Sequence, residues 1–237
     1  MQDCRKFCVL TTGRSGSTWL MEALARFPDI ALPNKQIDCA DSELLRPGGF
    51  GDHCRAYETL TDAWVIGQQG LIDIFYWHSA GAAFAGFKSM PHRHENFDDF
   101  LRRPDIRFIS LERADTASTV ASFLLALRAG TWRRHGAPPR QRWTFRPEDA
   151  GEVRAVLARL QENRAALARV PGAIRLTYED LCRDGFAAPE LDAFFERPIR
   201  FPEARPPVSG AAYTENWDDF LACLDLPEGG GEGTVRR

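Results

Sequence analysis

Hydrophobic residues along the chain form short compact runs separated by longer stretches with helical spacing. Four short apolar runs, each closed by a turn signal, predict buried strands. They are residues 6–11, 84–90, 106–111 and 173–177. Four longer stretches carry apolar side chains along one helix face and predict helices. They are residues 17–27, 58–77, 115–129 and 146–167. Strands alternating with helices predict an α/β domain, a P-loop-like parallel sheet covered by helices on both faces.

The length and composition of the chain fit one domain. The chain has 237 residues, of which 44% are hydrophobic and 27% are charged, enough to bury a full core. No Gly/Ser-rich or Pro-rich linker divides the middle of the chain, so we expect a single domain over residues 1–226. Residues 227–237 are rich in Gly and Glu and predict a disordered tail.

The charge balance argues against some classes of partner. The chain has 30 Lys and Arg against 33 Asp and Glu, and a formal net charge of -3. This balance is not that of a general nucleic-acid binder or a membrane-surface binder. No stretch is long and apolar enough to span a bilayer, and the apolar run at residues 7–10 is too short for a signal peptide. We therefore expect a cytoplasmic protein.

The six cysteines are scattered along the chain and show no paired CxxC spacing. In a reducing compartment such cysteines are expected to be free thiols. Cys39 and Cys54 could share a metal ion with His53, but buried thiols are the simpler interpretation. We expect no bound metal.

The most informative segment is residues 11–20 (TTGRSGSTWL), between the first strand and the first helix. Such a turn directs several backbone N–H groups and the positive end of a helix at one point, where an anion binds. Gly13 and Gly16 permit the tight backbone, and Arg14 adds a fixed positive charge. A Walker A loop would need Gly-Lys-Ser/Thr after a longer spacer, and this segment has neither. The turn therefore predicts phosphate binding without the signature of a magnesium-bound triphosphate site.

Residues 14–20 (RSGSTWL) resemble the 5′-phosphosulfate loop of sulfotransferases that use 3′-phosphoadenosine-5′-phosphosulfate (PAPS). The form of the loop is similar to that of bacterial carbohydrate sulfotransferases of the trehalose type, whereas cytosolic sulfotransferases usually have lysine in place of Arg14. The resemblance implies a sulfotransferase fold, PAPS as co-substrate and adenosine bisphosphate (PAP) as product. It implies that the nucleotide is bound by Arg14, Ser15, Gly16, Ser17, Thr18 and Trp19.

A second motif occurs where the family has its 3′-phosphate site. Residues 108–115 (FISLERAD) resemble the strand that ends in a phosphate-binding arginine, and a serine follows on the next helix. The match assigns the 3′-phosphate to Arg113 and Ser122. A strand-end arginine and a serine on the following helix can converge on one anion. The alternative interpretation is that Arg113 is a surface ion-pair partner and Ser122 an ordinary helix residue.

A third motif and a late segment extend the resemblance. Residues 175–181 (RLTYEDL) are similar to the family's strand-end Tyr-Glu-Asp-Leu, which implies that Tyr178 lies near the nucleotide. We interpret Glu179 and Asp180 as helix-capping rather than catalytic groups. Residues 213–217 (YTENW) resemble the segment that closes over the adenine side in relatives, where Arg205 is the nearest candidate for the usual basic residue.

Sulfuryl transfer should resemble phosphoryl transfer, with a loose in-line transition state and charge gathering on the leaving phosphate oxygen. It needs cations and N–H donors near that oxygen and a base for the acceptor. We expect Arg14 and the backbone of residues 15–18 to stabilise the leaving group. Lys88 matches a strand-end lysine of relatives and is expected to touch the transferring sulfonate; the alternative is a solvated strand-end lysine.

The general base is the point at which the chain departs from the family. Aligning residues 27–30 with the corresponding stretch of relatives puts Gln36 at or beside their catalytic glutamate, and an amide cannot accept the proton. Two candidates replace it. Asp38 would serve after a small shift, and His92 has a suitable intrinsic pKa. We favour His92 slightly.

We therefore expect an enzyme that transfers a sulfuryl group from PAPS to a hydroxyl or amine of a small-molecule or carbohydrate acceptor. Residues 37–77 and 132–146 are expected to shape the acceptor pocket, because loops on a rigid scaffold commonly determine substrate choice. Two alternatives stay open. The missing glutamate motivates a catalytically impaired relative that still binds PAP. A divergent P-loop kinase is the other, and the missing Gly-Lys-Ser/Thr counts against it.

Overall fold

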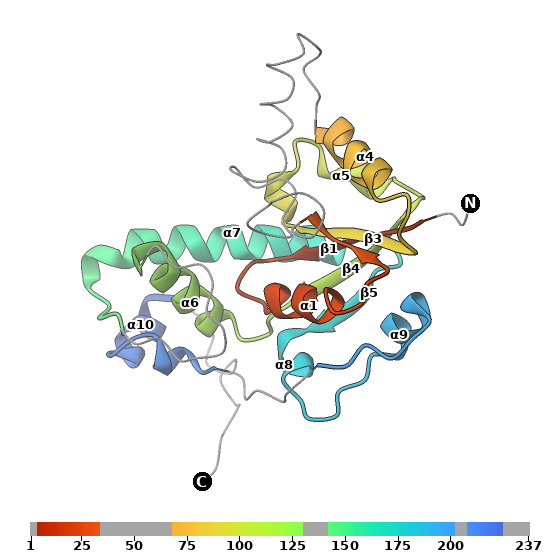
Figure 1. Ribbon diagram of the computed structural model, residues 1–237. Helices are drawn as coiled ribbons and strands as arrows, with labels where there is room; N and C mark the ends of the chain where they lie inside the picture. Colours follow the sequence, from red (N-terminus) through yellow and green to blue (C-terminus); the bar gives the residue numbers. More distant parts are fainter. Residues whose placement is uncertain (1–3, 34–67, 130–141, 202–207, 225–237) are drawn as a thin grey trace.

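The computed structural model describes residues 4–33, 68–129, 142–201 and 208–224 (Figure 1). A central sheet contains five strands, all parallel, in the order β2-β3-β1-β4-β5. They are β1 (Arg5–Thr11), β2 (Ile30–Ala31), β3 (Phe84–Ser89), β4 (Ile106–Glu112) and β5 (Ile174–Thr177). The predicted α/β architecture with a parallel sheet is confirmed, and β2, too short to give a sequence signal, is added to the four predicted strands.

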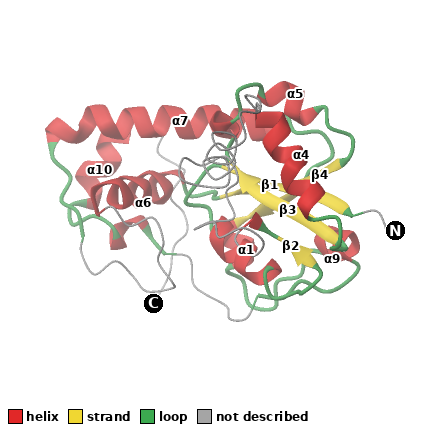
Figure 2. Ribbon diagram, turned by 45° about the horizontal axis from the view of Figure 1, so that its top comes forward, coloured by secondary structure: helices red, strands yellow, loops and turns green. Residues whose placement is uncertain are grey.

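Helices lie on both faces of this sheet (Figure 2). The α-helices are α1 (Ser17–Leu24), α4 (Gln68–His78), α5 (Phe97–Leu101), α6 (Thr116–Ala129), α7 (Ala150–Ala168), α8 (Tyr178–Leu181), α9 (Pro189–Phe195) and α10 (Trp217–Leu224). Short 3-10 turns are η1 (Pro91–Arg93), η2 (Pro147–Asp149) and η3 (Gly210–Ala212). Because parallel strands need crossover connections, most of these helices follow directly from the strand topology.

The two faces of the sheet build two separate cores from alternate residues of the same strand. In β1, Phe7 and Val9 pack with α1 and α9, whereas Cys8 and Leu10 pack with α4, α5 and the end of α7. Successive side chains of a strand point to opposite faces, so a strand covered on both sides must be apolar throughout. This explains why residues 7–10 form a continuous apolar run rather than an alternating one.

A third core lies beyond the carboxyl ends of the strands, at the left of Figure 1. There α6, the first half of α7 and α10 pack around aromatic side chains. Trp143 and Phe145 contact Phe220 of α10 edge-to-face, with ring centroids 5.8 and 6.0 Å apart. The segment after η3 joins this core, because the amide of Trp143 donates to the carbonyl of Tyr213 at 2.8 Å. This lobe therefore stands against the edge of the sheet where the strands end.

The helix boundaries differ from the predictions in two places. The first helix was predicted to run to Phe27, but α1 ends at Leu24, because the amides of Arg26 and Phe27 donate to carbonyls three residues back and tighten the chain into turns. The helix predicted from residue 146 begins with the 3-10 turn η2 before α7 continues to Ala168. Both differences are local hydrogen-bond choices at helix ends.

Asp115 is confirmed as the N-cap of α6, since its carboxylate accepts from the amide of Ser118 at 2.8 Å. Within the predicted helix 58–77, residues 58–67 lie outside the described residues, and the remainder corresponds to α4. The predicted tail, residues 227–237, also lies outside them. In the parts of the chain that the structure describes, no helix has the length and apolarity needed to cross a bilayer.

Candidate functional site

The carboxyl ends of the strands meet at one edge of the sheet, where the chain leaves neighbouring strands in opposite directions. After β1 it enters α1 on one face, and after β3 it enters η1 and α5 on the other. In open α/β sheets such a change of direction leaves a crevice at the strand ends, where ligands bind. The candidate site therefore consists of the turns that follow β1, β4 and β5, together with the last residues of β3.

The turn between β1 and α1 has an unusual backbone. Gly13, Arg14 and Gly16 all have positive φ, at 84°, 52° and 77°. A positive φ costs a residue with a side chain of order 1 kcal/mol, so Arg14 is held in a strained conformation. Gly16 is the N-cap of α1 and lacks a capping side chain, and α1 has no acidic residue in its first turn. The N–H groups of the first turn of α1 are thus not capped by a side chain of residue 16.

Ser15 braces this turn. Its hydroxyl is fully buried and lies within hydrogen-bond distance of the Thr11 hydroxyl, which also accepts from the amide of Gly13 at 3.3 Å. The side chain of Ser15 is therefore engaged with the turn itself. Of the residues predicted to bind a nucleotide here, Ser15 offers its backbone rather than its hydroxyl.

The structure brings the first and second predicted anion-binding motifs into contact. The Nε atom of Arg14 donates to the hydroxyl of Ser122 at 2.9 Å, although 108 residues separate them in sequence. Ser122 lies on α6 with an exposed fraction of 3%. The ring of the next residue, Phe123, lies 4.0 Å from the point where a Cβ atom of Gly13 would be. The turn after β1 and the second turn of α6 thus line the same edge.

Arg113 is a buried cation at the centre of this edge. Its exposed fraction is 3%, one Nη atom donates to the carbonyl of Val208, and its guanidinium lies 4.9 Å from the centre of the Tyr178 ring. Among the described residues, Arg113 has no carboxylate partner, and its Nε has no hydrogen-bond partner. Because a buried charge is unfavourable without a counter-charge, this guanidinium suits an anionic ligand. Arg113 is not the surface ion-pair residue of the alternative interpretation.

Tyr178 connects Arg113 to the glycine turn. A Cβ atom added to Gly16 would lie 2.6 Å from the Tyr178 ring, so the ring packs directly on the backbone of that residue. The phenol is half-buried, and burial raises the pKa of Tyr178 to about 12. Tyr178 therefore stays protonated at neutral pH and acts as a packing surface between Gly16 and Arg113 rather than as a base.

Lys88 reaches the same turn from β3. Its Nζ atom donates to the hydroxyl of Thr18 in the first turn of α1 at 3.2 Å, and its exposed fraction is 6%. The alternative of a solvated strand-end lysine is wrong. Three cationic side chains (Arg14, Lys88 and Arg113) thus come from three strand ends and gather around the start of α1.

Trp19 has a different environment from its neighbours in the turn. Its ring is buried in the core beneath α1, where it contacts Phe201 edge-to-face with centroids 5.2 Å apart. The exposed fraction is 8% for both Trp19 and Ser17, so both residues anchor α1. Thr18, by contrast, is half-exposed and lies beside Lys88.

His92 lies on η1 against α7. Its Nδ1 is 3.2 Å from the Oδ1 of Asn163, a buried polar residue of that helix. Burial lowers the pKa of His92, an effect that the Asn163 hydrogen bond partly opposes. If Nδ1 carries the proton donated to Asn163, then Nε2 carries the lone pair. His92 is therefore a neutral imidazole with a defined orientation at neutral pH.

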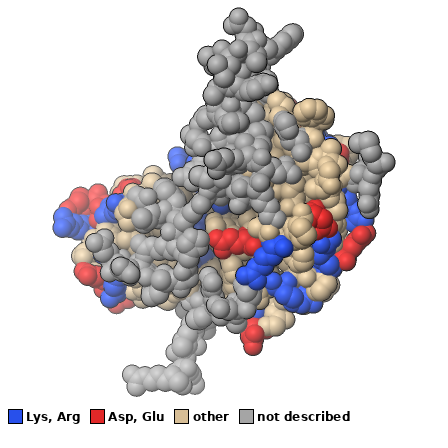
Figure 3. Space-filling model, in the orientation of Figure 1, with Lys and Arg blue, Asp and Glu red and all other residues tan. Residues whose placement is uncertain are grey.

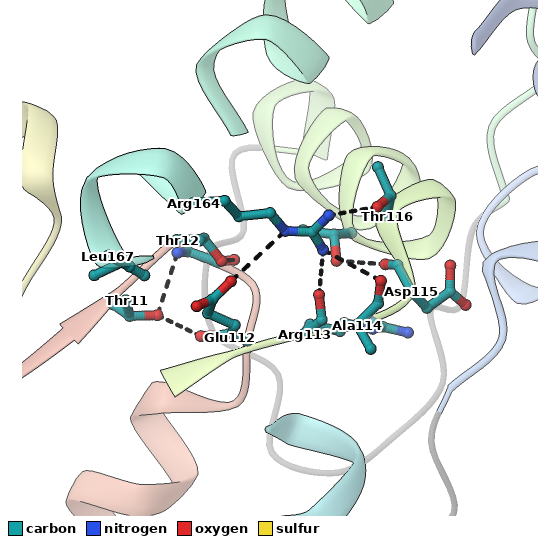
Figure 4. Close-up of polar contacts among 12 residues, drawn as sticks. Thr11, Thr12, Glu112, Arg113, Ala114, Asp115, Thr116, Arg164 and Leu167 are labelled. Atoms are coloured by element: carbon teal, nitrogen blue, oxygen red, sulfur yellow. Dashed lines mark hydrogen bonds and ion pairs between the residues drawn. The ribbon is translucent and has the colours of Figure 1, made fainter. Parts of the chain in front are cut away.

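The turn after β4 is held by two charged residues that sequence reasoning did not associate with the site. Figure 4 shows Arg164 of α7 pointing at this turn, where its Nη atoms donate to the carbonyls of Arg113 and Ala114 and to the hydroxyl of Thr116. From the other direction, the carboxylate of Glu179 accepts from the amides of Ala114 and Asp115 at 3.0 and 3.3 Å. Glu179 therefore binds the turn that precedes α6 and does not cap a helix as predicted; the N-cap of α8 is Thr177.

Arg164 was difficult to find from sequence. It occupies an ordinary position of a long helix that carries other arginines, such as Arg154 and Arg159. A residue of this type is usually a solvated helix arginine. Only the packing of α7 along the sheet directs Arg164 at the strand end.

Outside the site, charged side chains pair with opposite charges on the surface. Arg197 makes two hydrogen bonds with the carboxylate of Asp29, at 2.7 and 2.5 Å, and Arg200 pairs with Asp192 at 2.9 Å. Figure 3 shows the described Lys and Arg side chains on this face interspersed with Asp and Glu. Arg113 differs from these surface arginines in being buried and in having no carboxylate partner within the described part of the chain.

Several predicted residues lie outside the described residues. They are Gln36 and Asp38, the three metal candidates Cys39, His53 and Cys54, Arg205, and most of the two segments predicted to shape an acceptor pocket. Over the described ranges, no three His, Cys, Asp or Glu side chains gather in a way that could hold a metal ion.

The architecture places the chain among α/β proteins with an all-parallel sheet, and the buried cations at its carboxyl edge are suited to anion binding. No protein-family model matches the chain, and no curated protein matches it significantly.

Proposed function

We propose that the chain is a sulfotransferase that moves a sulfuryl group from PAPS to a hydroxyl or amine of a small-molecule or carbohydrate acceptor and releases PAP. The observation that carries the proposal is the buried guanidinium of Arg113 beside a glycine turn whose Gly16, the N-cap of α1, makes no side-chain cap hydrogen bond. Two anion-binding elements within one site suit a nucleotide with phosphate groups at both ends. The resemblance of residues 14–20, 108–115 and 175–181 to sulfotransferase motifs selects PAPS among such nucleotides.

The two ends of the nucleotide would be bound by different elements. Arg113 and Ser122 would bind the 3′-phosphate, where the Nε of Arg113, which has no hydrogen-bond partner among the residues that the structure describes, supplies a donor. The backbone of residues 15–18 and the side chain of Arg14 would bind the 5′-phosphosulfate. The Nε atom of Arg14 lies 2.9 Å from the hydroxyl of Ser122. Arg14 would therefore be close to the 3′-phosphate as well as to the 5′-phosphosulfate.

The transfer step breaks the bond between sulfur and the bridging oxygen of PAPS and forms a bond between sulfur and the acceptor oxygen or nitrogen. Negative charge gathers on the departing 5′-phosphate of PAP, which the N–H groups of the turn and Arg14 would stabilise. Lys88, held by Thr18 beside the turn, would neutralise the oxygens of the moving sulfuryl group. A permanently charged guanidinium such as that of Arg14 stabilises charge but donates no proton.

The acceptor proton requires a base. His92 fits this role chemically, because burial lowers its pKa and the Asn163 contact leaves Nε2 with a lone pair. Asp38 remains the alternative base. Substitution of each candidate base distinguishes His92 from Asp38. His92→Gln and Asp38→Asn should each retain PAP binding, and the variant that abolishes sulfuryl transfer identifies the base.

Ligand binding tests the first half of the proposal. PAP without magnesium should raise the unfolding temperature of the chain, because a ligand that binds only the native state stabilises it, and ATP with magnesium should raise it less. A larger shift with ATP and magnesium would favour a divergent kinase instead.

Turnover tests the second half. Incubation with PAPS and pooled sugars, phenols and amines should give acceptors heavier by one sulfuryl group, together with PAP in equal amount. Tight PAP binding with no transfer to any acceptor would instead support the catalytically impaired binding protein, and the absence of PAP binding would refute both.

A further inference from the structure

The peptide groups of the turn after β4 are held by opposite charges from two sides. On one side, the guanidinium of Arg164 donates to the carbonyl of Arg113 and, at 3.3 Å, to that of Ala114. It also donates to the Thr116 hydroxyl at 2.5 Å. On the other side, the carboxylate of Glu179 accepts from the next two amides along the chain, those of residues 114 and 115. We call Arg164 and Glu179 the turn clamp.

The two members of the turn clamp come from elements far from each other in sequence. Arg164 lies on α7, whereas Glu179 lies on α8 directly after β5. Figure 4 shows the guanidinium of Arg164 above the backbone of the turn, with Glu112 on its flank. The Nε of Arg164 is 3.9 Å from the Glu112 carboxylate, and the arginine side chain is 25% exposed. The turn is therefore fixed to α7 and to α8 at the same point.

The geometry points to the turn clamp as a positioning device for Arg113 in the proposed nucleotide site, and this inference rests on the proposed function. The clamp binds the carbonyl of Arg113 and the amide of Ala114, which form one peptide group, and both polar groups of the next peptide. Neither clamp residue needs to touch the ligand. Its effect is to fix the backbone from which the Arg113 side chain projects past Tyr178.

A fixed backbone matters because Arg113 has little else to orient it. Among the described residues, its guanidinium has a single hydrogen-bond acceptor, the carbonyl of Val208, and the Tyr178 ring beside it. Arginine loses considerable rotamer freedom when it is held in one geometry, so the protein gains affinity by holding it beforehand. Side chains that bind a ligand are most effective when supporting residues hold them in the geometry that binding requires.

The same clamp also positions Ser122. The amides that Glu179 binds immediately precede α6, and Thr116, which Arg164 binds, is the first residue of that helix. Ser122 lies in the second turn of α6. A displacement of the start of α6 would therefore move Ser122 relative to Arg14 as well as Arg113 relative to Tyr178.

Two substitutions test the turn clamp. Arg164→Lys keeps the charge but replaces a planar fork of donors with a single ammonium that cannot bridge two carbonyls and a hydroxyl. Glu179→Gln keeps the shape but replaces one of the accepting oxygens with a donor. Arg154→Lys is the matched control, because Arg154 is exposed on the same helix. Circular dichroism identifies the variants that fold, and either clamp variant suffices for the test.

Three measurements are made on wild type and variants: the Kd of PAP, the dependence of that Kd on salt, and hydrogen exchange at the amides of Ala114 and Asp115. We expect each clamp variant to raise the Kd of PAP by about tenfold or more, the effect of a lost hydrogen bond to a charged group. Exchange at the two amides should accelerate. The salt dependence is measured also on Arg164→Gln, which removes the charge. It should stay that of wild type, because each cation that contacts the anion adds to it and Arg164 does not.

Two results would overturn the inference. Faster amide exchange with an unchanged Kd would make the clamp a purely structural feature. A weaker salt dependence in Arg164→Gln, which removes the charge, would make Arg164 a direct ligand of the anion. If wild type itself binds no PAP, the proposed function is refuted, and the inference falls with it; wild-type binding with variants as tight as Arg154→Lys refutes the inference alone.

Discussion

Gly86 and Gly16 both lie against an aromatic ring that occupies the place of a Cβ atom. The two glycines nevertheless belong to regions that differ in backbone conformation and in the polarity of the buried residues. Gly86, in the middle of β3, makes room for the ring of Phe7 on the adjacent strand. Gly16, at the start of α1, makes room for Tyr178 and in addition has a positive φ. The first glycine serves packing alone, whereas the second combines close packing with a backbone that side chains disfavour.

The same contrast extends to the surroundings of each glycine. Around Gly86, the sheet interior is apolar, and Phe7 contacts Phe195 edge-to-face at 5.2 Å. At the edge where Gly16 lies, several of the buried residues are polar or charged. They include Thr11, Thr12, Ser15, Lys88, Ser89, Arg113 and Ser122. Burying polar groups is unfavourable for stability unless they are satisfied, and most of these groups are hydrogen-bonded to one another or to the backbone.

The largest expected effect separates the two regions by ligand affinity. Arg113→Ala should weaken PAP binding about 100-fold, because a buried charged hydrogen-bond donor contributes on the order of 3 kcal/mol to binding an anion. Arg107→Ala, at an exposed position of the same strand, is the control and should change the Kd less than about twofold. Calorimetric titration with PAP measures both. Equal affinities in the two variants would remove Arg113 from the site.

Acid should destabilise the core between the sheet and α5 through His94, which directly follows η1. This residue is 9% exposed and stacks on Phe100 with ring centroids 4.2 Å apart, and neither ring nitrogen has a hydrogen-bond partner among the described residues. Burial lowers the pKa of His94 from 6.5 to about 4. The unfolded chain therefore takes up the proton more readily. The contribution to stability is complete above pH 6.5 and is lost as the pH falls to about 4.

The size of this loss should be on the order of 3 kcal/mol in the free energy of unfolding. Urea denaturation of wild type and His94→Phe between pH 6.5 and pH 4 measures this loss of stability. The phenylalanine variant keeps an aromatic ring beside Phe100 but has no proton to gain, so its stability should fall less on acidification. Parallel curves for the two proteins would mean that His94 does not titrate in this range.

Alanine at the two glycines sharpens the comparison directly. Gly86→Ala should lower the free energy of unfolding by about 1–3 kcal/mol, because the added methyl overpacks the sheet against Phe7. Gly16→Ala should cost about 1–3 kcal/mol as well, through its positive φ and its contact with Tyr178. Only Gly16→Ala should also weaken PAP binding by the folded protein. Similar loss of affinity in both variants would argue against a distinct function of the edge.

The smallest expected effect concerns the cap of α6. Asp115→Ala should reduce the free energy of unfolding by about 1 kcal/mol, because the Ser118 amide loses its acceptor. Asn is an equally good N-cap, so Asp115→Asn should remain close to wild type in chemical denaturation. A deficit in Asp115→Asn as large as in the alanine variant would show that the charge, and not the cap, stabilises α6.

The sequence alone determined the elements that depend on neighbouring residues. The strands at residues 6–11, 106–111 and 173–177, the glycine turn and the Asp115 cap were all readable, because strand and helix periodicity and turn chemistry act within about ten residues. The helix end at Leu24 was not, because the tighter turns after it involve a choice between two local hydrogen-bond patterns. The short β2 exists only because β3 is there to pair with it.

Tertiary structure alone decided which of these local features meet. The contact between Arg14 and Ser122 spans 108 residues, and the contact of Arg164 with Arg113 spans 51. No local pattern distinguishes Arg164 from the exposed arginines of its helix. Parallel strands bring their carboxyl ends to one edge whatever their order in sequence, so the fold gathers charges that the sequence leaves scattered.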